Sequence, residues 1–227
     1  MKLSKFKFKV KPVEIVIVVS AIIVISVVAI LLKNYVKKQE VNNASIADNT
    51  KVEEGDTVIQ ITEQDANVEN VDGKEEATNN AEPLKIVIKK GSTAVLQIPS
   101  LGIIAQITEG SNPETLKNYV GVVEGSARPG RVGNYALAAH NNIDTEIFRD
   151  LHKIEIGAIV NVYTQNKMYT YKISEKFNVK PTQVDVLKGN DDKKEITLIT
   201  CNYNATERVI VKGTLLSEKR ATNISGI

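Results

Sequence analysis

The stretch "EITLITCNYNATERVIVKGTLL", residues 195–216, consists of two apolar runs separated by a polar loop. Both runs are rich in β-branched residues, which favour strands. We therefore predict a β-hairpin in which Cys201 and Arg208 face each other at the base of a six-residue loop. Because side chains alternate along a strand, Thr197, Ile199 and Cys201 should share one face.

The rest of the region 83–218 also has the sequence character of β-strands. Short strand-like runs recur along it, and Pro99 is expected at the end of one of them. Asn112 and Pro113 suit the start of a short helix, and residues 145–154 also have apolar residues at helical spacing. Residues 158–174 resemble a hairpin, and the stretch 179–189 is irregular with room for one helical turn. This pattern predicts a mainly β domain, a closed or nearly closed β-barrel with one or two short helices.

The N-terminus has the pattern of a membrane anchor. Residues 1–14 carry five lysines, and residues 15–32 form an apolar run interrupted only by two serines. Eighteen helical residues span about 27 Å, close to the ~30 Å hydrocarbon core of a bilayer. The run is longer than the core of a cleaved signal peptide. We predict a single-pass signal anchor in the cell membrane, with the N-terminus cytoplasmic and the β domain outside.

Residues 33–82 separate this predicted anchor from the β domain. From 39 to 82 there are twelve acidic residues, two lysines and no aromatic residue. Such a segment buries too little apolar surface to offset its ordering entropy, so we predict a disordered spacer. The run "TVIQIT" at 57–62 has strand character but stands alone. Residues 219–227 are expected to be a C-terminal tail.

Composition excludes several classes of function. No part of the chain has a dense basic stripe with interleaved aromatic residues, so nucleic acid is not an expected partner. The single cysteine rules out an intramolecular disulfide, and one cysteine with two histidines gives no metal-ligand spacing. No metal and no cofactor is expected.

Three residues have the chemistry of an acyl-transfer site. His140 and Cys201 both end apolar runs and precede polar loops, whereas His152 lies in a helical pattern and is expected at the surface. A nucleophilic thiol, a proton-carrying imidazole and a guanidinium that stabilises negative charge are the parts needed to attack an acyl carbonyl. The alternative from spacing alone is that Cys201 is a small buried apolar residue.

The combination "TLITC", an arginine seven residues later and an upstream "LAAH" resembles the sortase family of cell-surface cysteine transpeptidases of Gram-positive bacteria. "LQIPSLGI" at 96–103 and "VKPTQVDVL" at 179–187 add to the resemblance, which is greatest to class A and covers roughly residues 93–217. It departs from the family in having Ala139 and Asn141 beside the histidine. It implies an eight-stranded sortase-type β-barrel without a class C lid, and a class D or E assignment remains open. Some class A members bind calcium, but we do not expect calcium in this chain.

The resemblance also implies a mechanism. Cys201 would attack the Thr–Gly bond of an LPXTG-like sorting signal, His140 would move the proton, and Arg208 would hold the substrate and stabilise the oxyanion. The backbone beside Thr200 would assist as a second oxyanion donor. The thioester acyl-enzyme would then pass the surface protein to a peptidoglycan amine. By position, seven residues match the groove of the family: Ala138, Val179, Pro181, Val184, Val186, Leu187 and Ile199.

Two other functions remain open. A hydrolase would let water resolve the same thioester. A non-enzymatic surface-binding β domain would keep Cys201 buried and unreactive towards thiol reagents.

Overall fold

The computed structural model describes residues 26, 28–30, 32–33, 52–61 and 84–223 of the 227-residue chain. The chain divides into two compact units, residues 1–43 and 44–227. In the first, residues 26, 28–30, 32 and 33 are helical, and most of the predicted anchor, 15–32, lies outside the described residues. None of the helices in the described ranges is both long enough and apolar enough to span a membrane. All features below belong to the second unit.

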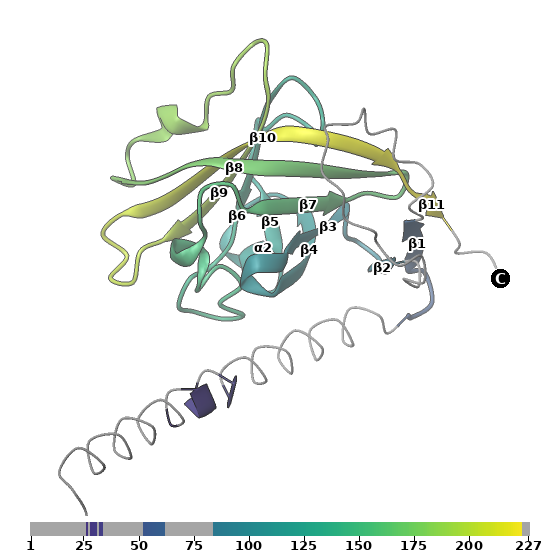
Figure 1. Cartoon of the computed structure of the whole chain (residues 1–227). Helices are drawn as coiled ribbons and strands as arrows, with labels where there is room; N and C mark the ends of the chain where they lie inside the picture. Colours follow the sequence, from purple (N-terminus) through teal and green to yellow (C-terminus); the bar gives the residue numbers. More distant parts are fainter. Residues whose placement is uncertain (1–25, 27, 31, 34–51, 62–83, 224–227) are drawn as a thin grey trace, which may run out of the picture. The chain divides into compact units, whose positions relative to one another are not determined.

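Eight strands close into a barrel in the order β10-β8-β7-β3-β4-β5-β6-β9 (Figure 1). β10 pairs with both β8 and β9, which closes the ring, so the predicted eight-stranded barrel is confirmed. The bounds are β3 (Ala94–Ile98), β4 (Ile103–Glu109), β5 (Val120–Val122), β6 (Gly133–Ala138), β7 (Ile159–Tyr163), β8 (Lys167–Val179), β9 (Lys194–Cys201) and β10 (Arg208–Arg220).

Alternate residues of these strands fill the barrel interior. Leu96, Leu137 and Leu198 are fully buried in one apolar cluster. Burying a side chain of this size contributes about 1.5–3 kcal/mol, so the barrel is stabilised mainly from inside. The alternation places the neighbouring residues, such as Ala138 and Ile199, on the outer face.

The predicted short helix after β4 is confirmed as α2 (Pro113–Leu116). The Asn112 side chain accepts the Thr115 backbone N–H at 3.0 Å, and Pro113 occupies the first turn. Pro99 likewise follows the end of β3, in the 3₁₀ turn η2 (Pro99–Leu101).

The helix indicated at 145–154 is wrong except for one 3₁₀ turn, η3 (Leu151–Lys153). The buried residues there are Phe148, Leu151 and Ile154, which are three apart and fit three residues per turn. Ile147, which suggested the α-helical spacing, is only partly buried. The exposed His152 agrees with its expected surface position.

The other two connections follow the prediction. β7 and β8 form a hairpin closed by a 2.8 Å hydrogen bond from Thr164 N to Lys167 O. The connection between β8 and β9 is irregular and contains one turn of 3₁₀ helix, η4 (Val184–Leu187).

A separate three-stranded sheet lies beside the barrel in the order β11-β1-β2, with β1 (Thr57–Ile61), β2 (Leu84–Ile88) and β11 (Thr222–Asn223). The predicted disorder of the acidic spacer does not hold for residues 57–61, which form β1. β1 pairs with β2 on one side and with β11 on the other, so it does not stand alone. The sheet packs on the outer face of β3 and β7 through an apolar cluster: Ile59, Ile86, Ile88, Val95, Tyr163 and Ala221.

Candidate active site

The β9–β10 hairpin places Cys201 and Arg208 directly opposite each other, as predicted. Loop residues 202–207 are fixed by a hydrogen bond from Asn202 N to Glu207 O, 3.0 Å, and by one from Glu207 N to Asn202 Oδ1, 3.1 Å. Residues paired in this way have Cα atoms about 4.5–5.5 Å apart. The hairpin therefore holds the thiol and the guanidinium at one edge of the barrel.

His140 reaches the same edge through the parallel pairing of β6 with β9. Ala138 is in register with Ile199, and the Ala139 N–H continues the ladder by donating to Ile199 O at 3.2 Å. His140 and Cys201 each lie two residues beyond that pair, on the outer face. Because neighbouring strands are about 4.8 Å apart, the register sets His140 beside Cys201. Across the adjacent strands β6, β9 and β10, the order is therefore His140, which follows the end of β6, then Cys201 and Arg208.

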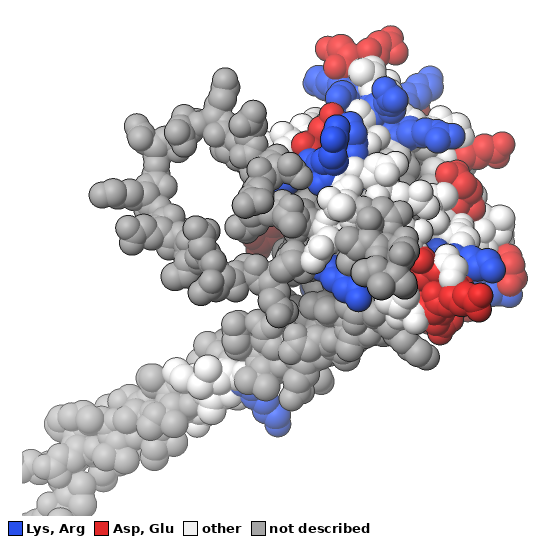
Figure 2. Space-filling model, turned by 90° about the vertical axis from the view of Figure 1, so that its right-hand side faces the viewer, with Lys and Arg blue, Asp and Glu red and all other residues white. Residues whose placement is uncertain are grey.

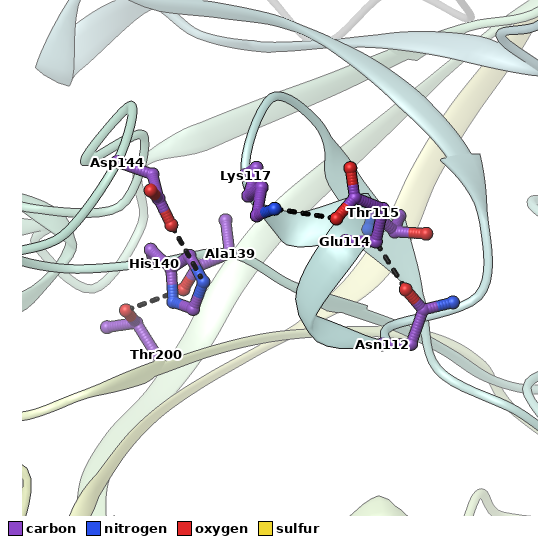
Figure 3. Close-up of polar contacts among 8 residues, drawn as sticks. All are labelled: Asn112, Glu114, Thr115, Lys117, Ala139, His140, Asp144 and Thr200. Carbon is purple, nitrogen blue, oxygen red and sulfur yellow. Dashed lines mark hydrogen bonds and ion pairs between the residues drawn. The ribbon is translucent and has the colours of Figure 1, made fainter.

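Two polar side chains tie the His140 segment to the Cys201 segment. Thr200 is 3% exposed, and its hydroxyl donates to Ala139 O at 2.8 Å (Figure 3). The buried Asn141 side chain donates to Cys201 O at 2.7 Å. The hydroxyl of Thr200 thus supports the histidine strand, and Asn141 is a supporting residue that the sequence did not reveal. The one indication of its role in the sequence is that this polar residue directly follows a histidine at the end of an apolar run.

Asp144 is a second residue that the sequence did not single out. Its Oδ2 lies 3.6 Å from Nε2 of His140, and Figure 3 shows the carboxylate pointing towards the imidazole. Asp144 has a φ of +55° and Glu146 one of +48°, a backbone region that is unfavourable for residues other than glycine. Strain of this kind is concentrated at functional sites.

The Arg208 guanidinium lies against its own loop. Nη1 is 3.2 Å from Glu207 O and 3.4 Å from Ala205 O. The Glu207 carboxylate is instead hydrogen-bonded by the side-chain amides of Asn178 and Asn202. Within the part of the chain that the structure describes, Arg208 therefore has no carboxylate partner, and its charge is available to a substrate.

The predicted groove residues fall into two sets. Ala138 and Ile199 are partly exposed neighbours on the outer face of β6 and β9. Asn134 connects that face to the β8–β9 connection, because its side chain accepts from the Thr197 hydroxyl at 2.8 Å and donates to Leu187 O at 2.9 Å. Val186 and Leu187 are partly buried there.

The other predicted groove residues differ in burial and do not lie together. Val179 ends β8, pairs with Arg208 and is buried. Pro181 is exposed, and Val184 is 67% exposed. Val184 and Leu187 also line a cavity of about 550 Å³ shared with the β5–β6 connection, at the opposite end of β6 from His140. The structure therefore brings together Ala138 and Ile199, which form the floor of the predicted groove. It does not bring all of the other predicted groove residues to them.

Cys201 is a free thiol of intermediate exposure. A partly exposed thiol does not agree with the buried structural cysteine of the surface-binding alternative. Among the described residues, no group of three or more His, Cys, Asp or Glu side chains gathers in a metal-binding arrangement.

The sortase domain family model matches residues 96–216. Sortase A of Streptococcus agalactiae serotype III is 32% identical over 126 residues, 53% of this chain and 51% of that protein. Sortase SrtE1 of Streptomyces coelicolor is 33% identical over 144 residues, 56% of this chain and 41% of that protein. The chain therefore spans about half the length of these curated relatives.

Solved structures give the same result. The Sortase D5 transpeptidase of Clostridium perfringens matches with a TM-score of 0.53 and 36% identity, covering 57% of this chain and 82% of that one. The relatives include sortases named A, D and E, so the similarity extends beyond class A. Since the family model covers more than half of the chain, this protein belongs to the sortase family.

Proposed function

We propose that this protein is a membrane-anchored cysteine transpeptidase. It cleaves an LPXTG-like sorting signal between Thr and Gly and transfers the surface protein to an amine of peptidoglycan. The observation that carries the proposal is the position of Cys201 between His140 and Arg208 on three adjacent strands. Family membership and the partial exposure of the thiol support it.

The first half of the reaction forms a thioester. The Cys201 thiol gives its proton to His140, and the thiolate attacks the carbonyl carbon of the substrate threonine. As the Thr–Gly C–N bond breaks, the imidazolium returns that proton to the leaving glycine amine. Asp144, 3.6 Å from the imidazole, stabilises the charged intermediate form of His140.

The second half reverses the proton movement. An amine attacks the thioester carbonyl, His140 accepts its proton, and Cys201 leaves as the thiolate. Arg208 stabilises the negative charge that develops on the carbonyl oxygen in both halves, because a guanidinium donates in a fixed fork. A Leu-Pro segment of the substrate suits the apolar floor of Ala138 and Ile199.

The proposed location follows from the N-terminal sequence. Residues 15–32 are proposed to anchor the chain in the cell membrane, with residues 1–14 cytoplasmic and the barrel outside. This orientation gives the barrel access to surface proteins and to peptidoglycan amines, its proposed partners.

The test uses the full chain in detergent, a set of labelled LPXTG-type peptides and an amine nucleophile such as triglycine. The expected product carries the peptide up to Thr joined to triglycine, identified by its mass. A peptide with Thr replaced by its D-enantiomer is the matched control and should not react. Failure of every sorting-signal variant to give a ligated product would overturn the proposal. Release of only hydrolysed peptide at saturating amine would favour the hydrolase.

A further inference from the structure

A second cavity, of about 690 Å³, lies at the end of the barrel opposite to Cys201. It is lined by residues at the ends of β4 and β5 and at the beginnings of β3, β6 and β8. Cys201 ends β9, which is parallel to β6, so the two sites are separated by the length of the barrel. The residues used below are Glu109, Arg128, Arg131, Tyr135, Asn166 and Tyr169, all of which line the cavity.

Arg128 and Arg131 are the two ends of a tight turn. The Arg131 N–H donates to Arg128 O at 3.1 Å, and Gly130 between them has a φ of +72°. Proline followed by glycine at the centre fits a type II turn, in which the first and last residues lie close together. The turn thus places both arginines at one rim of the cavity.

The turn is held rigidly on the barrel. The Gly130 N–H donates to the buried Tyr171 hydroxyl at 2.8 Å. A Cβ on Gly130 would lie 2.1 Å from the Tyr169 ring, so only glycine allows this close contact. The two arginines therefore project from a fixed backbone, which reduces the entropy lost when a ligand binds.

The cationic groups of this turn have no acidic partner. None of the ion pairs among the described residues includes Arg128 or Arg131, although the Glu109 carboxylate lines the same cavity. Guanidinium groups without an ion-pair partner can bind an oxyanion through paired hydrogen bonds.

Tyr135 adds a phenol to the wall of the cavity. The residue is 3% exposed and lines the cavity, and its hydroxyl is accessible there. Burial raises the pKa of Tyr135 above its usual range, so the phenol stays a neutral donor that a ligand in the cavity can use.

The remaining lining residues of the cavity suit a ligand that carries hydroxyl groups. The Glu109 carboxylate accepts hydrogen bonds, the Asn166 amide both donates and accepts, and Tyr169 presents part of an aromatic ring. Figure 2 views the molecule from this side, where Lys and Arg side chains gather in the upper part and the largest group of Asp and Glu lies at the lower right. This face of the molecule therefore carries both positive and negative charges, and it does not resemble a uniformly basic face that binds polyanions.

We propose that this cavity binds an anionic sugar. Its phosphate or carboxylate lies between Arg128 and Arg131, its ring lies near Tyr169, and its hydroxyls bind Glu109, Asn166 and the Tyr135 hydroxyl. The proposal does not depend on the chemistry of Cys201, because the two sites are at opposite ends of the barrel.

Calorimetric titration of the full chain in detergent tests the proposal. The probes are glucose 1-phosphate, glucuronate, glucose and inorganic phosphate. We expect the two anionic sugars to bind more tightly than glucose or inorganic phosphate, and the stronger of the two identifies the preferred anion. Arg128→Gln with Arg131→Gln should weaken their binding by at least about tenfold. Tyr135→Phe should weaken it by about threefold or more.

A charge-matched control separates the site from net charge. Lys172→Gln with Lys180→Gln removes two exposed charges elsewhere, and binding should stay within about twofold. Equal effects of the two double variants, equal binding of glucose, or equal binding of inorganic phosphate would each overturn the anionic-sugar site. Peptide ligation by the double arginine variant should match that of the unchanged chain, so a failure here is distinguishable from a failure of the transpeptidase proposal.

Discussion

The edge of the barrel that carries Cys201 and the three-stranded sheet β11-β1-β2 are stabilised in different ways. The Cys201 edge consists of partly exposed side chains held by polar contacts, such as those of Thr200 and Asn141. The sheet is held by buried apolar residues that come from distant parts of the chain, with Ile59 fully buried. Changes at the edge should therefore alter activity with little effect on stability, and changes in the sheet should do the opposite.

The largest expected effect is the loss of the nucleophile. Cys201→Ala should lower peptide ligation by at least about 10⁴-fold, because no other described residue is a thiol. The midpoint of thermal unfolding should hardly change, since Cys201 is outside the core. Mass spectrometry of the products and circular dichroism measure the two quantities. Ligation by the alanine variant at a comparable rate would exclude Cys201 as the nucleophile.

Arg208→Lys should lower kcat/KM by about 10²–10³-fold, because an ammonium cannot replace a fork of donors at the oxyanion. Lys212→Gln is the control, since Lys212 lies on the same face of β10 four residues along, opposite Thr197. That variant should retain the original kcat/KM. Equal losses in both variants would contradict a specific role of the Arg208 guanidinium at the oxyanion.

Ile59→Ala tests the other side of the comparison. It should lower the free energy of unfolding by about 2–5 kcal/mol through lost apolar burial and a cavity. Val52→Ala, at an exposed position, should change it by no more than about 0.5 kcal/mol. Urea denaturation measures both, and kcat at low temperature should be unaffected. A drop in kcat without a drop in stability would show that the sheet acts on the site.

Alkaline pH should weaken the folded state. Burial raises the pKa of Tyr163 and of Tyr171 from 10.0 to about 12. The folded protein holds these protons more tightly, so the stability is fully present below pH 10 and is lost as the pH rises from 10 towards 12. Urea unfolding should lose about 1.4 kcal/mol per pH unit for each tyrosine. Burial also raises the pKa of Tyr135, so three tyrosines contribute and Tyr163→Phe should lower the slope by about a third. A slope unchanged in that variant would exclude Tyr163 as a source.

The smallest effect is expected at Asn141. Asn141→Ala removes the hydrogen bond to Cys201 O and should lower kcat about fivefold to tenfold with little change in KM. Asn142→Ala, which removes a 3.1 Å bond to the exposed Tyr203 carbonyl, should change kcat by less than about twofold. A rise in KM alone would indicate that Asn141 contacts the substrate instead of positioning Cys201.

The sequence predicts what depends on local patterns. The alternation in 195–216 gives the hairpin register that sets Cys201 against Arg208, and Asn112 marks the beginning of α2. The strand character of residues 57–62 is visible in the sequence, but the pairing of β1 with β2 and β11 is not, because it depends on contacts between distant segments. The position of Asp144 beside His140 depends on a left-handed backbone conformation that its residue type does not demand.

The most direct test of the central claim is the intact mass of the full chain after brief reaction with an LPXTG-type peptide in the absence of added amine. We predict a mass increase equal to the peptide acyl group, located on Cys201 by peptide mapping and removed by hydroxylamine. An adduct on another residue, or turnover of the peptide without any adduct that hydroxylamine removes, would contradict the thioester mechanism.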